Sequence, residues 1–241
     1  MEIEEILNQL ETADEVVPVV ALTEAAGRPV EMIPVLVTIL EYTASHAQDV
    51  IKNKQLTHIF AMMLLAQYRE KSAYQAIFEI FSLPGETSLD LTGDFVTEYL
   101  MRVLASVCCG DISLIQQLVE NPGVNEYVRS AALRSLLVLV ASDELYREEA
   151  VDYISELFNG KLESTPSLVW CTLVDCCGEL HISELEGEVE AAFTDGRVDP
   201  EFVSLEQIKD RLQEDREEVL QALAHNPTYA IVYDVVTELV G

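Results

Sequence analysis

Apolar residues recur at helical spacing along most of the chain. Ile3, Ile6, Leu7 and Leu10 occupy positions i, i+3, i+4 and i+7, which is the spacing of a helix that buries one face. Convincing alternation of apolar and polar residues, the pattern of a half-buried strand, appears nowhere in the sequence. The pattern therefore predicts an all-α protein.

Glycines and prolines mark the ends of the predicted helices. The 10 Gly and 8 Pro residues fall mostly between periodic segments, where they interrupt helical structure. Pro18 and Pro34 lie inside apolar patterns instead, so each is expected to begin or kink a helix. Asp111, Ser183 and Pro166 are predicted at helix starts. The predicted helices are 2–11, 15–26, 30–45, 55–68, 71–82, 93–109, 111–120, 124–142, 146–158, 166–179, 182–194, 201–213, 215–225 and 227–240.

Several segments repeat along the chain. Residues 107–111 are echoed at 175–179, and near the midpoint 140–143 again holds two small residues followed by an acid. Two helices per ~30–45 residues are typical of an α-solenoid, in which stacked helical hairpins form one curved array. We therefore predict a single helical-repeat domain over 1–241.

The predicted array has three parts. An N-terminal cap covers about 1–50, core repeats cover 51–180, and an acidic C-terminal cap covers 181–241. The cap assignment follows from the many acids between 184 and 218, because the ends of a solenoid need polar outer faces.

The charge balance narrows the classes of partner. The chain holds 43 Asp and Glu against 14 Lys and Arg, a net charge of −29, so it is poorly suited to neutralising phosphates. Direct nucleic-acid binding and membrane binding are therefore not expected. A basic protein or peptide is the predicted partner, because complementary fields select partners and speed association. An acidic nucleic-acid mimic or toxin-neutralising protein is an alternative.

The N-terminus and the cysteines indicate the compartment. The acidic start lacks the basic and apolar regions of an export signal, and the charge-free run 55–68 is shorter than a membrane span. Five cysteines, four of them in adjacent pairs, do not resemble a disulfide framework. We expect a cytoplasmic protein that is a monomer or weak dimer.

No sequence motif indicates a metal, a cofactor or a catalytic residue. Cys171, Cys176, Cys177 and His181 lie close together, but the chain has no CxxC pair, so we interpret its cysteines as small buried residues. Nucleophile and phosphate-binding motifs are equally lacking. The sequence predicts His58 in the core or at an interface, and it predicts His46, His181 and His225 at the surface.

Asp94 and Glu98 share a helix face at i and i+4. Such a pair can hold a divalent ion or act in acid/base catalysis. With 43 acids such pairs also arise by chance. The runner-up hypothesis is an enzyme, metal-dependent or acid/base, that uses Asp94, Glu98, Glu126 and Arg129 in the groove of the solenoid.

A polar segment begins the predicted helix 124–142. Asn125 is a candidate N-cap, Glu126 suits the helix dipole, and Arg129 is a candidate to pair with Asp94 or Glu98. These residues form either a structural ladder between repeats or a concave surface that binds a partner. Trp170 is either a core residue or an exposed recognition anchor.

Four segments of the chain resemble a known family: residues 93–98, 125–133, 147–149 and Trp170. Over about 30–205 the chain resembles a bacterial family of unknown function with HEAT-like helical repeats. Some members carry a C-terminal SecA-type zinc tail, which cannot be carried over because no cysteine follows Cys177 here. The resemblance implies a HEAT-like solenoid and no particular activity. We therefore expect a non-catalytic interaction scaffold or adaptor with an acidic binding surface.

Overall fold

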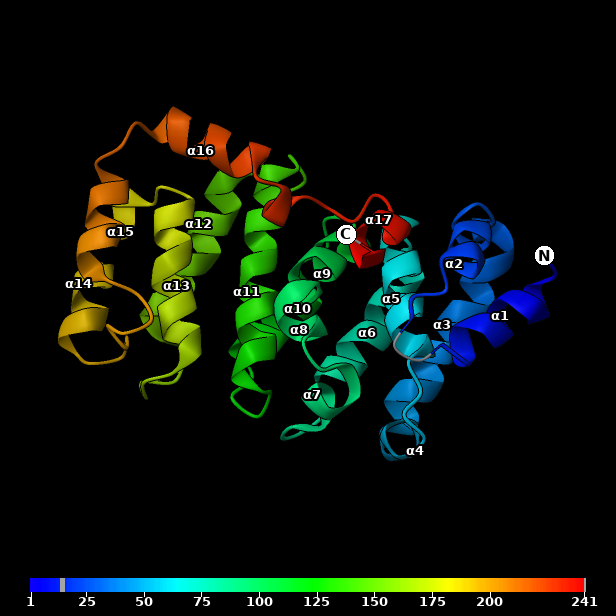
Figure 1. Ribbon diagram of the computed structural model, residues 1–241. Helices are drawn as coiled ribbons and strands as arrows, with labels where there is room; N and C mark the ends of the chain where they lie inside the picture. Colours follow the sequence, from blue (N-terminus) through cyan, green and yellow to red (C-terminus); the bar gives the residue numbers. More distant parts are fainter. Residues whose placement is uncertain (14–15, 241) are drawn as a thin grey trace. The chain divides into compact units, whose positions relative to one another are not determined.

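The computed structural model describes residues 1–13 and 16–240, and every regular element in them is a helix (Figure 1). The all-α prediction is confirmed. The predicted helix 15–26 begins at a residue outside the described part, and its described portion is α2, Val19–Ala26. This helix begins directly after Pro18, as the fixed backbone of proline favours.

The chain divides into two compact units. Unit 1 comprises Met1–Leu114 and Ile231–Gly241, and unit 2 comprises Ile115–Ala230. The helices of unit 1 are α1 (Ile3–Glu11), α2, α3 (Pro29–Ser45), α4 (Ala47–Lys52), α5 (Thr57–Gln67), α6 (Tyr74–Phe81), α7 (Thr87–Thr92), α8 (Phe95–Glu98), α9 (Leu100–Cys108) and α17 (Val235–Val240), with a 3₁₀ turn at Lys71–Ala73. The helix α10 (Ser113–Glu120) crosses the division. The helices of unit 2 are α11 (Glu126–Ala141), α12 (Arg147–Glu156), α13 (Leu168–Glu179), α14 (Glu186–Thr194), α15 (Leu205–Leu212) and α16 (Arg216–His225), with a π-helical turn at Leu157–Lys161 and 3₁₀ turns at Ser183–Leu185 and Pro227–Tyr229.

The core of unit 1 is built around α5. This helix packs against α3 and α9, and its residues from Phe60 to Ala66 are all buried. A helix that is apolar all round must be covered on every side, so the charge-free run 55–68 is a core helix. Pro34 lies inside α3 with its side chain exposed, and Val30, four residues earlier, is also exposed. Because Pro34 has no N–H, the Val30 carbonyl lacks its helical donor, and water can donate to it instead.

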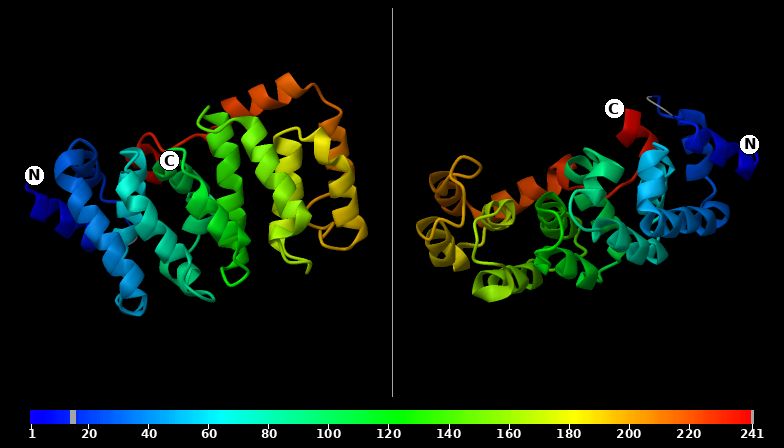
Figure 2. Two further views of the ribbon diagram at one scale, coloured as in Figure 1. Left: turned by 180° about the vertical axis from the view of Figure 1, so that it is seen from behind. Right: turned by 90° about the horizontal axis from the view of Figure 1, so that it is seen from below.

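The C-terminal segment differs from the predicted helix 227–240. A 3₁₀ turn at Pro227–Tyr229 is followed by a non-helical stretch and then α17. Main-chain groups in this stretch bind side chains of unit 1 instead of one another: Ser106 Oγ accepts from Val232 N at 3.0 Å, and Arg102 donates to the Ile231 carbonyl at 3.3 Å. Figure 2 shows α17 beside α2 and α5, with which it makes contacts. These tertiary hydrogen bonds outweigh the local preference for helix.

In unit 2, alternate helices stack on one another. The helix α11 packs on α13, and α13 packs on α15, while α16 contacts both α11 and α13. Their buried faces are rich in Leu, Val, Ala and Cys, which lets helices approach closely and fill the interior without voids.

Left-handed turns end several helices at related positions. Arg69, Asp143 and His181 have φ of 57°, 57° and 48°. The next residue in each turn donates its N–H to a carbonyl five positions earlier at 2.8–3.0 Å, which closes the helix end in a Schellman-type turn. The helix predicted at 124–142 ends close to the expected residue, since α11 ends at Ala141, whereas 175–179 forms the last turn of α13, which ends at Glu179 with Leu180 as its C-cap.

Other helix boundaries depart from the sequence pattern. The predicted helix 93–109 is interrupted at Tyr99, which separates α8 from α9. The short helices α4 and α7 were not expected, because six residues are too few to show a clear period. Asp111 accepts from Ser113 N at 3.2 Å at the start of α10, as predicted. The start predicted at Pro166 is wrong, since α13 begins at Leu168.

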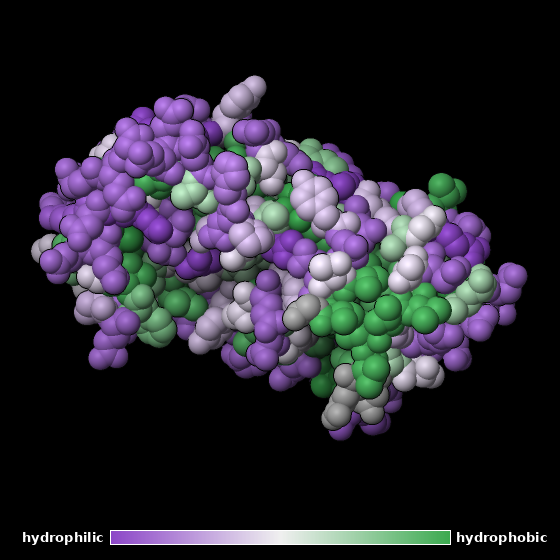
Figure 3. Space-filling model, turned by 45° about the horizontal axis from the view of Figure 1, so that its top comes forward, coloured by the Kyte–Doolittle hydropathy of each residue, from purple (hydrophilic) through white to green (hydrophobic). Residues whose placement is uncertain are grey.

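On the face drawn in Figure 3, the two units differ in polarity. Figure 3 shows hydrophilic side chains over α14–α16 and an apolar patch over α17 and the beginning of α2. Exposed apolar residues of these two helices include Val20 of α2 and Val240 of α17, which are 63% and 59% exposed. Among the described residues, no helix combines the length and hydropathy needed to cross a bilayer.

Candidate functional site

The predicted polar segment at the start of α11 contributes one residue, Arg129, to a buried cluster. Asn125 caps the helix, accepting from Tyr127 N at 2.9 Å. Arg129 is only 3% exposed and donates to both carboxylate oxygens of Glu163, at 2.6 and 2.7 Å, and to the Val119 carbonyl at 2.9 Å. The hydrogen bonds from Arg129 lower the pKa of Glu163. Arg129 is thus a structural residue of unit 2, and its expected pairing with Asp94 or Glu98 is wrong.

Trp170 belongs to the same cluster. It is 1% exposed, and its indole N–H donates to the Glu163 carbonyl at 2.8 Å. The Arg197 guanidinium lies 4.9 Å from the ring centroid, a cation–π distance. The core interpretation of Trp170 is confirmed, and the exposed-anchor interpretation is wrong because the ring is already covered.

Asp94 and Glu98 are exposed and lie in unit 1. The main-chain carbonyl of Asp94 accepts from Thr97 Oγ1 at 3.0 Å and from Glu98 N at 3.0 Å, which begins α8. Glu126 and Arg129 lie in unit 2. Of the predicted site residues, the structure therefore places Arg129 and Trp170 in the interior of unit 2, and leaves Asn125 half-buried and Glu126 exposed at its surface.

Glu126 lines a surface hollow of unit 2, named here the Glu126 hollow. Its volume is about 200 Å³. The lining combines carboxylates, aromatic rings and small residues: Glu126, Tyr127, Pro166, Ser167, Leu168, Cys171, Asp199 and Phe202. Two helix starts shape it, since Glu126 Oε2 accepts from Leu168 N at 2.9 Å and thereby joins the start of α11 to the start of α13.

The Glu126 hollow presents acceptors and exposed rings. Asp199 Oδ1 accepts from Glu201 N at 2.9 Å, and the Ser167 hydroxyl has no hydrogen-bond partner. Tyr127 and Phe202 are 47% and 69% exposed. The lining as described includes no Lys or Arg. Carboxylates beside aromatic rings suit a guanidinium or ammonium group.

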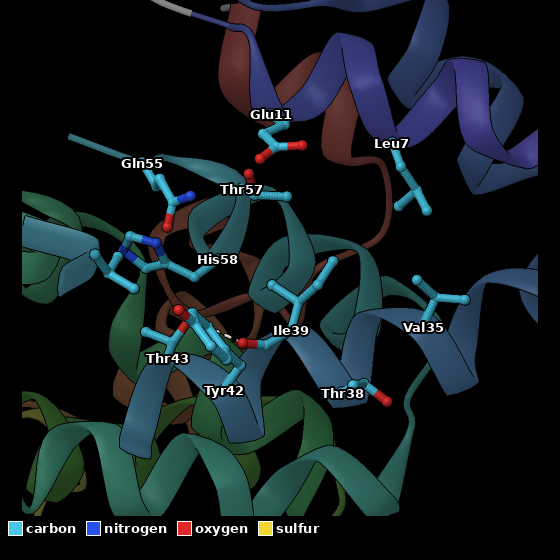
Figure 4. Close-up of a pocket in the computed structure, with 11 residues that line it drawn as sticks. Leu7, Glu11, Val35, Thr38, Ile39, Tyr42, Thr43, Gln55, Thr57 and His58 are labelled. Carbon is cyan, nitrogen blue, oxygen red and sulfur yellow. Dashed lines mark hydrogen bonds between the residues drawn. The ribbon is translucent and has the colours of Figure 1, made fainter. Parts of the chain in front are cut away.

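A second hollow lies in unit 1 between α1, α3 and α5, and is named here the His58 hollow (Figure 4). Its volume is about 490 Å³, within the range of small-molecule sites. Leu7 and Glu11 of α1 face the α3 side chains across it (Figure 4). The complete lining is Leu7, Glu11, Val35, Thr38, Ile39, Tyr42, Thr43, Val50, Gln55, Thr57 and His58.

His58 is buried at the inner wall of this hollow and is 1% exposed. Its Nε2 lies 2.9 Å from the Leu91 carbonyl, so Nε2 carries the proton and donates. Burial lowers the pKa of His58 below 6.5, although the Leu91 hydrogen bond opposes the shift. The neutral ring therefore leaves Nδ1 as an acceptor, and Nδ1 has no hydrogen-bond partner.

The sequence indicated only part of these sites. His58 is buried as expected, but His181 is also buried, because its Nε2 donates to the Glu214 carbonyl at 3.0 Å; the surface prediction for His181 is wrong. Asp199 and Phe202 lie on either side of Pro200 in the loop between α14 and α15, and no spacing rule connects them to Glu126. Only folding brings these distant segments together.

The cysteines give no sign of a metal centre. Four of the five are buried, and Cys109 is exposed. Among the described residues, no group of three or more His, Cys, Asp or Glu side chains is arranged to hold a metal ion. Burial raises the pKa of Cys176 and Cys177, so these thiols stay protonated and unreactive at neutral pH.

Thiol labelling checks this arrangement. In the native protein we expect Ellman's reagent to modify Cys109 rapidly and the buried thiols slowly, because the reagent needs an accessible thiolate. All five should react in denaturing urea. In the Cys109→Ser variant the rapid phase should disappear, and a rapid phase that persists there would show that a buried cysteine is accessible.

Comparison with known proteins identifies the family. The model for the family described as "Protein of unknown function (DUF1186)" matches residues 1–240. The chain belongs to the DUF1186 family. The match extends beyond residues 30–205, over which the sequence resemblance was drawn.

Two relatives from Chlamydia have similar length. One from Chlamydia trachomatis serovar D and one from Chlamydia muridarum are each 39% identical over 216 residues, covering 89% of this chain and 86% of the relative. Both are named "Uncharacterized protein". No solved structure matches the chain.

Proposed function

We propose that this protein is a non-catalytic interaction module of HEAT-like helical repeats, whose acidic surface binds a basic protein or peptide. The observation that carries the proposal is the Glu126 hollow, where two carboxylates lie beside two exposed aromatic rings. We assign the module to the cytoplasm, as its five free cysteines favour.

Regular side-chain contacts support the repeat architecture within each unit. Arg129 binds Glu163 across 34 residues, Arg147 binds the Leu180 carbonyl across 33, and Arg211 binds Glu179 across 32. In unit 1 His58 reaches Leu91 across 33 residues. A nearly constant sequence separation is expected where each repeat contacts its neighbour. A single curved array over the whole chain stays a prediction.

The charge distribution supports a basic partner. Most of the 14 Lys and Arg side chains form ion pairs within the chain, such as Arg147 with Glu184 and Arg134 with Asp175. The excess of 29 negative charges is therefore presented to solvent mainly as carboxylates. Such a field attracts basic segments and repels nucleic acid.

The Glu126 hollow supplies the specific contact. An arginine side chain entering it would meet the carboxylates of Glu126 and Asp199, while its planar face stacks on Tyr127 or Phe202. The unpartnered Ser167 hydroxyl is a further acceptor there. We therefore expect an arginine-containing segment to bind more tightly than a lysine-containing one.

Calorimetric titration with synthetic peptides tests the proposal. The probes are Arg-Gly, Lys-Gly and Glu-Gly repeat peptides of equal length, measured at low and moderate salt. We expect the Arg-Gly peptide to bind most tightly, and the Glu126→Gln/Asp199→Asn variant to bind it about tenfold more weakly. The matched control, Asp210→Asn/Glu217→Gln, removes the same charge from exposed positions of unit 2 and should change binding less than about twofold.

Three outcomes would count against the proposal. Equal weakening in both double variants would show attraction by net charge alone. Saturable binding of Mg²⁺ or Ca²⁺ lost in the Glu126 hollow variant would favour the metal-dependent enzyme. In a third case, the protein would capture a basic nucleic-acid-binding protein from lysate, and added DNA would release that captured protein. This result would favour the nucleic-acid mimic.

A further inference from the structure

We infer that the His58 hollow of unit 1 binds a primary alkylammonium group: a hydrocarbon chain enters the hollow, and its charged N–H donors bind the acceptors that line it. This inference uses different residues from the Glu126 hollow and does not depend on the proposed interaction function. Its basis is the shape of the hollow and the direction of the hydrogen bonds around it.

The hydrocarbon part follows from the apolar lining. Leu7, Val35, Ile39 and Val50 contribute aliphatic side chains, and Val50 is buried. The volume of about 490 Å³ accommodates a chain of several carbons. Removing such a chain from water provides the non-directional part of the binding free energy.

The ligand must supply hydrogen-bond donors, because two hydroxyl groups in the lining already donate their protons to main-chain carbonyls. Thr38 Oγ1 donates to the Pro34 carbonyl at 2.9 Å, and Thr43 Oγ1 donates to the Ile39 carbonyl at 2.8 Å. Each oxygen keeps lone pairs and has no second proton. Both therefore present only acceptors to a ligand in the hollow.

His58 adds an acceptor that is buried and unused. Its Nε2 proton is held by the Leu91 carbonyl, so Nδ1 accepts only, and it has no hydrogen-bond partner. An unpaired polar atom in the interior carries a desolvation cost, which a ligand N–H would relieve. Figure 4 shows His58 and Gln55 at the same end of the hollow.

The preference for a positive head group follows from two of the lining residues. Glu11 carries a carboxylate on the α1 side of the hollow, and Tyr42, which is 49% exposed and stacks on His46, presents an aromatic ring on the α3 side (Figure 4). Within the described lining there is no Lys or Arg to neutralise Glu11. A carboxylate, an aromatic ring and several acceptors favour an ammonium group over a neutral or anionic group.

Hexylammonium, hexanol and hexanoate test the inference, because they share one hydrocarbon chain and differ in the head group. We expect saturable hexylammonium binding by calorimetry, with amide NMR shifts concentrated at the residues of the His58 hollow. Hexanol should bind about tenfold more weakly, and hexanoate more weakly still. Equal binding of hexylammonium and hexanol would overturn the inference.

Two variants locate the site, and the first has a matched control. Glu11→Gln should weaken hexylammonium about fivefold or more, whereas Glu5→Gln, an equal charge change at an exposed position of the same helix, should not. His58→Gln keeps an N–H donor for the Leu91 carbonyl but moves the acceptor from the Nδ1 position to the amide oxygen, so it should also weaken binding in a protein with an unchanged circular dichroism spectrum. An equal loss of hexylammonium affinity in Glu11→Gln and Glu5→Gln would show non-specific electrostatic attraction and would contradict binding in the His58 hollow.

The source of the ammonium group is distinguished by a further probe. Nα-acetyl-lysine amide carries the same butylammonium end attached to a peptide backbone. Tighter binding of hexylammonium assigns the hollow to free amines, and tighter binding of the lysine derivative assigns it to a lysine side chain. Either result supports the alkylammonium chemistry, and failure of both to bind refutes it.

Discussion

The Arg129→Ala variant is expected to lose about 3–5 kcal/mol of the free energy of unfolding of unit 2, because it leaves the Glu163 carboxylate without its partner in a largely buried site. Arg129 also binds the Val119 carbonyl, so a second acceptor loses its donor. Trp170, the single tryptophan, contacts the same cluster through its bond to the Glu163 carbonyl. Urea unfolding followed by Trp170 fluorescence therefore reports the effect directly.

A surface ion pair provides the control for Arg129. Glu156 pairs with Lys161 at 2.8 Å, with side chains 57% and 41% exposed, so Glu156→Ala should cost less than about 1 kcal/mol. The stability loss in Arg129→Lys should lie between those of Arg129→Ala and Glu156→Ala, because lysine keeps the charge but cannot make the bidentate contact with the carboxylate. Equal midpoints for Arg129→Ala and Glu156→Ala would show that the buried pair does not stabilise unit 2.

The Glu238→Ala variant is expected to destabilise unit 1 by a similar amount, about 3–5 kcal/mol. Arg102 is only 9% exposed and binds both carboxylate oxygens of Glu238, which holds α17 against α9. Tyr99 Oη also donates to the Glu238 carbonyl at 3.1 Å. Without the carboxylate, the Arg102 guanidinium is left buried beside apolar residues, and the C-terminal segment loses its main polar attachment.

Two probes separate this effect from unit 2. Unfolding of unit 1 should lower the helical circular dichroism signal before Trp170 fluorescence changes, because Trp170 lies in unit 2. Glu31→Ala is the control in unit 1, since Glu31 and Arg28 form an exposed i,i+3 pair at 2.6 Å, worth less than about 1 kcal/mol. A Glu238→Ala protein as stable as Glu31→Ala would mean that the C-terminal segment is not anchored through Arg102.

Helical periodicity and chain breaks were sufficient for much of the secondary structure. The segments 55–68, 146–158 and 215–225 correspond to α5, α12 and α16, with boundaries shifted by one or two residues. These helices are amphipathic or wholly apolar over several turns, so local pattern and burial agree. Local pattern failed at 227–240, where side chains from residues more than a hundred positions earlier bind the main chain.

The candidate sites show the same division. The sequence singled out Asn125, Glu126, Arg129 and Trp170, but it could not tell a ladder residue from a surface residue, because both follow the same helical spacing. The partner of Arg129 is Glu163, whose position near α13 depends on how one helix pair stacks on the next. Asp199, Phe202 and the lining of the His58 hollow carried no motif at all.

The sequence by itself determined the helical class, the acidic charge and the buried state of most cysteines, because each depends on composition or on local periodicity. Tertiary structure alone decided which cations are buried, which acids remain exposed, and where the two hollows form. The physical reason is that desolvation and hydrogen-bond pairing depend on neighbours distant in sequence. Arginine is therefore buried in a structural ion pair at position 129 and exposed to solvent at position 216, as Arg129 and Arg216 show.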